Sequence, residues 1–407
     1  MRILIVSQYF WPESFLITDF AEGMTQRGHR VDVLTGAPNY PGGRVFGGYS
    51  PWNFLCEKRG ETAIFRVPLA PRGRGGGFRL ALNYLSYVLS AVIFGSLHFL
   101  ARGFPYEVML VYGVSPPTQA LPALWFSCFS KAKVVFWVQD LWPETLPAVG
   151  YSNKWLVRLA SGLVKFIYRR CHLLLGQSRS MVGRLSRPEL RAARLEYLPN
   201  WAESIFVSGQ NAQGGPADLP AGFNLIFAGN FGQAQGLEDW LTATARLKGR
   251  VSFNLIFIGE GRAKADLAAL AKKLDLERTV FFLGFKPLEQ MPSYFAKADA
   301  LLLSMKKTAA FNYVVPRKLS TYLMAGRPVL AAALGETADI INKSGAGLTC
   351  PPGDPQVLAD LMETFIRLDI KDRERMSRQG RDYAEANFSR PALLERFEKL
   401  LESILTG

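Results

Sequence analysis

The chain has 407 residues, 49% of them hydrophobic and 20% charged, which excludes a disordered protein and leaves room for two or three globular domains. Its net charge of +14 admits nucleic acid, an anionic membrane surface or phosphorylated substrates as partners. The four cysteines, at 56, 128, 171 and 350, are too far apart for a disulfide framework or a zinc site, and a reducing cytoplasm fits them. The first apolar run, residues 2–7, is too short for a signal peptide and is predicted as a strand.

The first half of the chain reads as a series of buried parallel strands separated by helices. The strand-like runs are residues 2–7, 30–35, 107–112, 133–138, 173–176 and 194–198. The carboxyl ends of such strands share one edge of the sheet, where ligands bind. The first strand leads into Glu13 and Ser14, and the run 133–138 leads into Gln139, Asp140 and Glu144. These side chains are therefore candidates for chemistry at that edge.

Residues 1–206 are therefore predicted to form a single α/β domain. Two further features of this domain are a histidine and a long loop. His29 follows the helix predicted at 19–26 and lies at the opposite edge of the sheet, so a structural role at the helix end is expected. The turn-rich loop after residue 36 lies at the ligand edge. Residues 207–222 are rich in Gly, Pro, Ala and Gln and are predicted to form a linker.

Two helical segments suggest contact with a membrane. Residues 82–100 are mostly apolar and long enough to span a bilayer, but polar residues interrupt them; we interpret the segment as a helix in the membrane interface, with a buried core helix as the alternative. In residues 153–171, a 100° step per residue gathers Lys154, Arg158, Lys165 and Arg169 on one side, opposite an apolar side that includes Ile167. A cationic stripe suits anionic headgroups, and a solvated helix face is the alternative.

The second domain is predicted from a strand, loop, helix and strand at residues 224–261. The loop GNFGQAQG follows the strand 225–228 and precedes the helix 237–247, and the next strand is 253–258. Unpaired N–H groups at a helix start favour phosphate or diphosphate, although a tight turn that binds nothing is the alternative. Further strands are predicted at 280–283, 300–304 and 329–332, with helices at 291–297, at 319–325 and from 356 onward.

Four cations, Lys306, Lys307, Arg317 and Lys318, follow the strand 300–304 and are expected to face the glycine loop. A dianionic diphosphate needs this charge, because a helix start supplies only about half an elementary charge.

The motifs of both halves together resemble the family 4 retaining glycosyltransferases. In the second domain these are IFIGEGRAKADLAALAKKLDLERTVFFLGF, PRKLSTYLMAGRPVLA and GAGLTCPPGDPQVLADLM. In the first, RILIVSQYFWPES and VQDLWPE resemble the WbuB-like branch, which builds O-antigen, colanic acid and capsule. The resemblance covers nearly the whole chain.

The resemblance implies an α/β protein with the GT-B fold, in which two Rossmann-like domains face a central cleft. It places acceptor binding in residues 1–206 and nucleotide-sugar binding in residues 223–388, with a C-terminal helix, 389–407, that packs back on the first domain. The implied donor is a nucleotide-sugar, with UDP as the expected nucleotide. The implied acceptor is a saccharide on polyprenyl diphosphate, so the protein is expected on the cytoplasmic face of the inner membrane.

The chain departs from the family pattern at the donor site. Asn230 and Gln235 stand where many members have an Arg and a Lys, and Tyr313 and Thr321 stand where the family has paired glutamates. We therefore assign the diphosphate to Lys318, with Lys306 and Arg317 as helpers, because a buried dianion must be neutralised. Asp140 is left to orient or deprotonate the acceptor hydroxyl.

The remaining assignments follow the same logic. Glu13, Ser14, Gln139 and Glu144 are assigned to the acceptor. No DxD pair occurs in the sequence, so no metal is expected. A non-catalytic nucleotide-sugar-binding or scaffold protein is the alternative function, and nucleic acid is not an expected partner because no recognition module is visible. The donor is assigned to Gly229, Asn230, Phe231, Gly232, Gln235, Gly259, Gly284, Phe285, Lys306 and Thr321.

Overall fold

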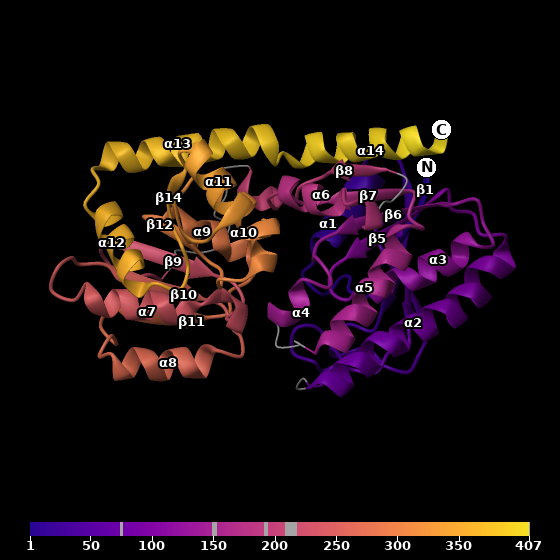
Figure 1. Ribbon diagram of the computed structural model, residues 1–407, viewed down its shortest axis with the longest axis horizontal. Helices are drawn as coiled ribbons and strands as arrows, with labels where there is room; N and C mark the ends of the chain where they lie inside the picture. The colour runs from indigo at the N-terminus through magenta and orange to yellow at the C-terminus, as the bar shows by residue number, and fades with distance from the viewer. Residues whose placement is uncertain (74–75, 149–152, 191–193, 208–217, 407) are drawn as a thin grey trace. The chain divides into compact units, whose positions relative to one another are not determined.

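The computed structural model describes residues 1–73, 76–148, 153–190, 194–207 and 218–406. These form two compact units: unit 1 is Met1–Pro199 with Pro391–Gly407, and unit 2 is Asn200–Arg390 (Figure 1). The boundary predicted after residue 206 is wrong by seven residues, because Ala202 and Phe206 are buried in the core of unit 2. Most of the predicted linker, residues 208–217, lies outside the described residues.

Unit 1 is built on a sheet that has eight strands in the described chain, in the order β3-β4-β2-β1-β5-β6-β7-β8. All neighbouring pairs are parallel except β3 with β4. The central strands are continuous apolar runs because helices cover both sides of a parallel sheet. The strands are β1 (Arg2–Val6), β2 (Arg30–Gly36), β3 (Leu55–Arg59), β4 (Thr62–Val67), β5 (Val108–Gly113), β6 (Lys133–Val138), β7 (Leu173–Gly176) and β8 (Leu195–Tyr197).

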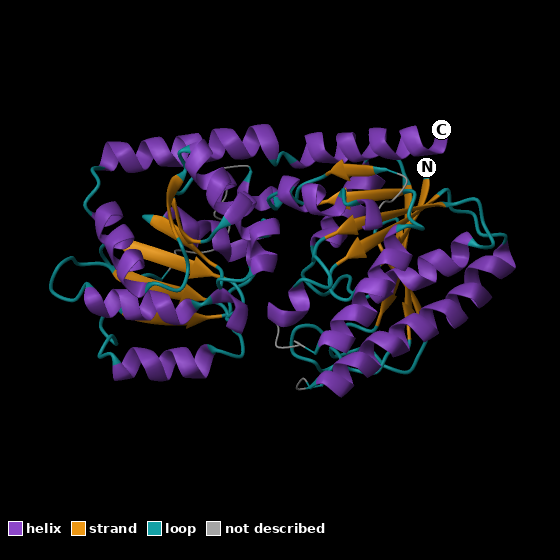
Figure 2. Ribbon diagram, viewed as in Figure 1, coloured by secondary structure: helices purple, strands orange, loops and turns teal. Residues whose placement is uncertain are grey.

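The helices of unit 1 flank this sheet (Figure 2). They are α1 (Leu16–Gln26), α2 (Gly77–Phe99), α3 (Leu121–Ser127), α4 (Thr145–Ala148), α5 (Lys154–Tyr168), α6 (Arg179–Leu185) and, from the end of the chain, α14 (Arg390–Thr406).

Helix α14 completes the core of unit 1. The ring of Phe397 packs edge-on against the ring of Phe20 in α1, with 4.7 Å between centroids. Glu398 binds Arg27 and also lies 2.7 Å from Nε2 of His29. His29 therefore has a structural role at the helix end, as predicted.

Helix α2 buries Asn83 together with apolar side chains such as Tyr87 and Phe99, and it exposes a second row of large apolar side chains on the opposite face. Asn83 is fully buried, accepts a hydrogen bond from Nε2 of Gln8 (2.7 Å) and donates one to the carbonyl oxygen of Ala70 (2.6 Å). The opposite face is exposed, so a helix buried in the core, the alternative considered above, is wrong. We call this face the α2 stripe; it consists of Phe78, Leu82, Leu85, Leu89, Ile93 and Leu97.

Helix α5 has three faces rather than the two predicted. Ile167, predicted to share the apolar side opposite the cations with Trp155 and Leu159, is instead buried with Ala160 and Val164. Trp155 and Leu159 remain 79% and 73% exposed and form an apolar strip on the outer surface. The cations predicted to share one side lie between this strip and the core-facing side, because they are about 40° to 100° from Trp155 on the helix wheel.

Unit 2 contains a parallel sheet, with six strands described, in the order β11-β10-β9-β12-β13-β14. Alternate residues of β9 enter two separate cores: Leu225 and Phe227 enter one, Ile226 and Ala228 the other. The sheet is thus covered on both faces. The strands are β9 (Asn224–Ala228), β10 (Asn254–Ile258), β11 (Val280–Gly284), β12 (Ala300–Ser304), β13 (Val329–Ala332) and β14 (Gly347–Cys350).

The helices of unit 2 include one that begins directly beside the glycine loop, α10. The full set is α7 (Leu237–Arg246), α8 (Lys264–Lys273), α9 (Met291–Ala296), α10 (Arg317–Met324), α11 (Gly335–Ser344), α12 (Pro355–Ile366) and α13 (Ile370–Asn387).

Candidate functional site

Three loops lie against one another at the carboxyl edge of the unit 2 sheet. The N–H of Gly229 donates to the carbonyl of Ile258, and the N–H of Gly259 donates to the carbonyl of Gly284, both at 2.8 Å. Gly229 and Gly259 have φ of +136° and +137°, and a Cβ on Gly259 would lie 2.0 Å from the Gly229 carbonyl oxygen. Only glycine fits this approach, which leaves backbone rather than side chains at the edge.

The side chain of Lys318 lies directly on the Gly229 turn. A Cβ at Gly229 would be 2.4 Å from Cε and Nζ of Lys318, and Nζ is 3.9 Å from the centroid of the Phe227 ring. Nζ is buried and has no hydrogen-bond partner in the part of the chain that the structure describes. Burial lowers the pKa of Lys318 to about 7. A buried ammonium without a counter-charge is a strong attractor for an anion.

Helix α10 holds Lys318 in this position. One turn after Lys318, the hydroxyl of Tyr322 donates to the carbonyl of Ala228 (3.1 Å) and accepts from its N–H (3.2 Å), which fixes α10 to the end of β9. Among the described residues, no side chain caps the start of α10 at Pro316. The helix start therefore adds unpaired N–H groups and a partial positive charge beside the ammonium.

The two cations predicted to help Lys318 are paired with carboxylates. Arg317 lies 3.1 Å from Oε1 of Glu203, and Lys306 lies 3.1 Å from Oε1 of Glu238. Each pair is close to neutral, so the idea that Arg317 and Lys306 contribute free charge needs correction. Lys307 is exposed to solvent, and Lys318 is the cation of the four that is buried against the Gly229 turn.

Glu203 is a site residue that the sequence reasoning missed. Its Oε2 accepts a hydrogen bond from Oγ1 of Thr321 at 2.7 Å, while Oε1 holds Arg317. A carboxylate thus stands next to Thr321, where the family pattern had led us to expect one and the sequence shows none. No local signal marks Glu203, which precedes the sheet of unit 2 and meets α10 only through the fold.

The other predicted donor residues divide into exposed and buried groups. Asn230 and Phe285 are exposed, Phe285 to 72%, and Gly232, Gln235 and Gly284 are partly exposed. The side chain of Phe231 is fully buried, with its ring 6.0 Å from that of Phe257. The assignment of this side chain to the donor is therefore wrong, because it is core; only its backbone lies at the edge.

Asp140 lies at the equivalent edge of unit 1, after β6. Its Oδ2 accepts hydrogen bonds from the N–H (2.9 Å) and the hydroxyl (2.7 Å) of Ser115, and that hydroxyl also accepts from Nε1 of Trp142 (2.9 Å). Burial raises the pKa of Asp140, although the Ser115 hydrogen bonds partly oppose the shift. The carboxylate is thus held in one orientation at the strand end.

Of the predicted acceptor residues, Glu13 and Glu144 are engaged within unit 1. Glu13 is buried and accepts from the N–H groups of Asn39 (2.8 Å), Tyr40 (2.6 Å) and Phe10 (3.3 Å), so it fixes the loop after β1 to the loop after β2. Burial raises its pKa to about 7. Glu144 forms an ion pair with Arg184. Both carboxylates brace this edge, and Oε2 of Glu144 is buried without a hydrogen-bond partner among the described residues; Ser14 is exposed and Gln139 is buried.

Each of the two units matches a glycosyl transferase domain of known proteins. Residues 16–201 match the model of the glycosyl transferase 4-like domain, and residues 221–383 match that of glycosyl transferases group 1. The chain is a family 4 glycosyltransferase. It is 25% identical over 419 residues to the putative colanic acid biosynthesis glycosyl transferase WcaI of Escherichia coli K12, covering 98% of each chain. It is 28% identical to the probable glycosyltransferase WbjE of Pseudomonas aeruginosa, covering 85% of each.

Solved structures agree on the fold of this glycosyltransferase, which is GT-B with two Rossmann-like domains. Sucrose-phosphate synthase of Thermosynechococcus elongatus aligns with a TM-score of 0.78 at 15% identity over 100% of this chain and 99% of that one. Anabaena HepE, solved in complex with UDP, aligns with a TM-score of 0.67 at 16% identity over 99% and 100%. The predicted fold class and enzyme class are thus confirmed.

Proposed function

We propose that this glycosyltransferase moves a sugar from a nucleotide-sugar, with UDP as the favoured nucleotide, to a saccharide on polyprenyl diphosphate, with retention at the anomeric carbon. The observation that carries the proposal is the ammonium of Lys318, which is buried beside Gly229 and the start of α10 and has no hydrogen-bond partner among the described residues. Relatives named for colanic acid synthesis and a structural neighbour solved with UDP support the reaction and its place in bacterial surface polysaccharide synthesis.

The donor diphosphate would bind Lys318 and the N–H groups at the start of α10. Gly229 and Gly259 let its oxygens approach the backbone, and the exposed ring of Phe285 offers a surface on which a base can stack. Binding of the dianion would return the pKa of Lys318 toward its ordinary value, because an opposite charge favours the ammonium.

The chemistry would be mainly electrostatic. The oxygen of the acceptor hydroxyl bonds to the anomeric carbon while the bond from that carbon to the diphosphate breaks on the same face. Asp140 first accepts a hydrogen bond that orients the bound hydroxyl, and during transfer the hydroxyl proton passes to the departing phosphate oxygen. Lys318 and the helix N–H groups carry the charge that develops on the leaving group, so the proposal assigns no role to a metal ion and expects transfer to persist in EDTA.

We further propose that the protein lies on the cytoplasmic face of the inner membrane. The α2 stripe and the outer strip of α5 together expose apolar side chains, and cations on α5 adjoin them. An apolar strip bordered by cations suits an interface with anionic lipid.

Transfer itself is tested with radiolabelled UDP-sugars and a bacterial membrane extract as acceptor, followed by extraction of labelled lipid. Labelled product supports the proposal. Binding of UDP-sugars without any product across the donor panel would instead favour a non-catalytic nucleotide-sugar-binding protein.

Replacing Glu203 with Gln is expected to lower the donor KM about tenfold and leave kcat nearly unchanged. The change removes the counter-charge of Arg317 beside the diphosphate site, and a hydrogen bond from the freed guanidinium to the donor would contribute about 1.5–3 kcal/mol. Steady-state kinetics with varied UDP-sugar measures the effect. Glu363→Gln is the matched control, because Glu363 has similar exposure and also pairs with arginines, but on α12. Equal KM values for Glu203→Gln and Glu363→Gln would contradict this role.

Replacing Asp140 with Asn is expected to lower kcat by about 10-fold to 10²-fold, because a hydrogen bond to a charged group contributes about 1.5–3 kcal/mol and a neutral amide accepts a weaker one. In the wild type, kcat should fall as the pH drops through the pKa of Asp140, because the ionised carboxylate accepts a stronger hydrogen bond than the protonated acid. Burial raises that pKa, so the fall occurs above the ordinary range of an aspartate. Asp32→Asn removes another buried carboxylate of unit 1, one that binds Tyr106, and should leave kcat unchanged.

A further inference from the structure

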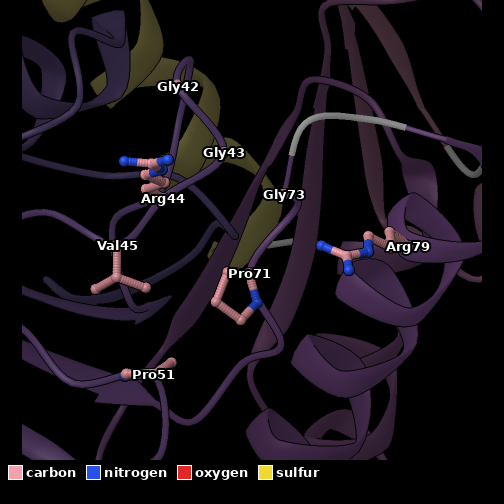
Figure 3. Close-up of a pocket in the computed structure, with 8 residues that line it drawn as sticks. All are labelled: Gly42, Gly43, Arg44, Val45, Pro51, Pro71, Gly73 and Arg79. Atoms are coloured by element: carbon pink, nitrogen blue, oxygen red, sulfur yellow. The ribbon is translucent and has the colours of Figure 1, made fainter.

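A cavity of about 550 Å³ lies in unit 1 at the start of α2 (Figure 3). Its walls come from the loop after β2, which carries Gly43 and Arg44, and from the loop after β4, which carries Pro71 and Gly73. Arg79, in the first turn of α2, closes a third side. The cavity therefore lies at the same carboxyl edge of the sheet as Asp140. It is next to β2 and β4, on the opposite side of the central strand β1 from β6.

Close backbone contact holds the two loops together. The N–H of Gly73 donates to the carbonyl of Gly43 at 2.8 Å, and the N–H of Gly43 donates to the carbonyl of Asn39 at 2.8 Å. A Cβ on Gly43 would lie 1.8 Å from the carbonyl oxygen of Gly73. Both glycines have positive φ, so this approach requires them. The cavity is thus a fixed feature of the loops.

The polar side chains that line the cavity are two arginines. Figure 3 shows the Arg79 side chain extending from α2 toward Gly73, and its Nη1 lies 2.7 Å from where a Cβ of Gly73 would be. Within the described residues, neither Arg44 nor Arg79 forms an ion pair, whereas Arg59 and Arg66 of the same unit pair with Glu22 and Glu57. The cavity therefore presents two uncompensated positive charges, which match a diphosphate.

The α2 stripe begins beside this cavity. Phe78 precedes Arg79, and the stripe continues to Leu97, a length of about 28 Å at 1.5 Å per residue. An anionic group in the cavity and an apolar chain on the stripe would therefore be contiguous. An isoprenoid diphosphate is a molecule with this combination of groups.

We propose that the Arg44–Arg79 cavity binds the diphosphate of the lipid-linked acceptor, and that its isoprenoid chain runs along the α2 stripe. This inference rests on the proposed function for the identity of the acceptor. It also places the reducing end of the acceptor saccharide, which is attached to the diphosphate, beside this cavity. The cavity follows β2 and β4, whereas Asp140 follows β6, three strands from β2. At about 4.8 Å between strands, the saccharide spans about 14 Å.

The test measures binding of farnesyl diphosphate, farnesol and inorganic pyrophosphate to the full chain by calorimetry. In the wild type, farnesyl diphosphate should bind more tightly than either fragment. The double variant Arg44→Gln/Arg79→Gln should bind farnesyl diphosphate at least tenfold more weakly, with farnesol and UDP binding unchanged. The control Lys58→Gln/Lys131→Gln removes two exposed charges of unit 1 away from the cavity and should match the wild type.

Two results would overturn the inference. The first is that the arginine variant binds farnesyl diphosphate as the wild type does. The second is an equal loss of binding to phosphatidylglycerol vesicles, which would assign the arginines to bilayer headgroups. Transfer to membrane extract by the wild type is measured in parallel. Its absence counts against the proposed function, while the farnesyl diphosphate comparison still decides the cavity's ligand.

Discussion

Replacing Lys318 with Met is expected to lower kcat/KM for sugar transfer by about 10³-fold, at the upper end of the effect of losing one donor to a developing anion. Among the residues that the structure describes, the ammonium of Lys318 has no hydrogen-bond partner at the Gly229 turn, whereas Arg317 and Lys306 are held by carboxylates. Methionine keeps most of the length of the lysine side chain and can still pack against Phe227. The control is Lys307→Met, which removes an exposed lysine from the same loop. Near-normal turnover of Lys318→Met would rule out the assigned role.

The same substitution is expected to stabilise the protein without substrate. Burial lowers the pKa of Lys318 from 10.5 to about 7, so between these pH values the unfolded chain binds one more proton than the folded chain. The lysine therefore destabilises the fold most below pH 7, and this cost decreases as the pH rises toward 10.5. At pH 6, Lys318→Met should raise the free energy of unfolding by about 1–4 kcal/mol. Denaturant titrations at several pH values measure the difference; a gain that does not shrink with pH would contradict the burial of the charge.

Replacing three residues of the α2 stripe, as Leu85→Gln/Leu89→Gln/Ile93→Gln, is expected to weaken binding to lipid vesicles about 10²-fold. The three residues are 56%, 54% and 54% exposed, so each can bury about half its surface in lipid. At about 1 kcal/mol for each half-buried side chain, the sum of about 3 kcal/mol gives that factor. Flotation with vesicles of bacterial lipid measures it.

The matched control for the stripe replaces exposed apolar residues of unit 2, as Leu288→Gln/Val357→Gln/Ile370→Gln. It removes a similar amount of exposed apolar surface and should float as the wild type does. If both triple variants float equally well, the α2 stripe is not a membrane contact.

The sheets were largely predictable because parallel strands buried on both faces are continuous apolar runs. The run 133–138 coincides with β6, and 300–304 coincides with β12. The strands β3, β4 and β14 were not predicted; the residues of β3, LCEKR, are mostly exposed and lack the apolar pattern. Hydropathy alone could not predict which face of α2 is exposed. The burial of Asn83 depends on a hydrogen-bond partner, Gln8, that lies 75 residues earlier in the sequence.

The part of the donor site formed by strand ends was predictable. The ion pairs and packing contacts of individual side chains were not. Gly229 and Lys318 each lie at the carboxyl edge of the same sheet, so their proximity followed from topology. The pairing of Arg317 with Glu203 did not, because it joins residues more than a hundred positions apart through a segment without periodic structure. The core position of Phe231 was hidden for a related reason: a glycine-rich loop usually faces solvent, but here its aromatic residue turns back under the sheet edge.

The contribution of α14 to unit 1 imposes an order on biosynthesis. The ring of Phe397 and the carboxylate of Glu398 reach Phe20, Arg27 and His29 only after all of unit 2 has been translated. At about 5–20 residues per second, the ribosome needs about 10–40 s for that stretch. During this interval the surface of unit 1 that α14 later covers, around Phe20 and His29, is exposed on the nascent chain. A fragment ending at residue 199 would lack α14 and leave this surface exposed permanently.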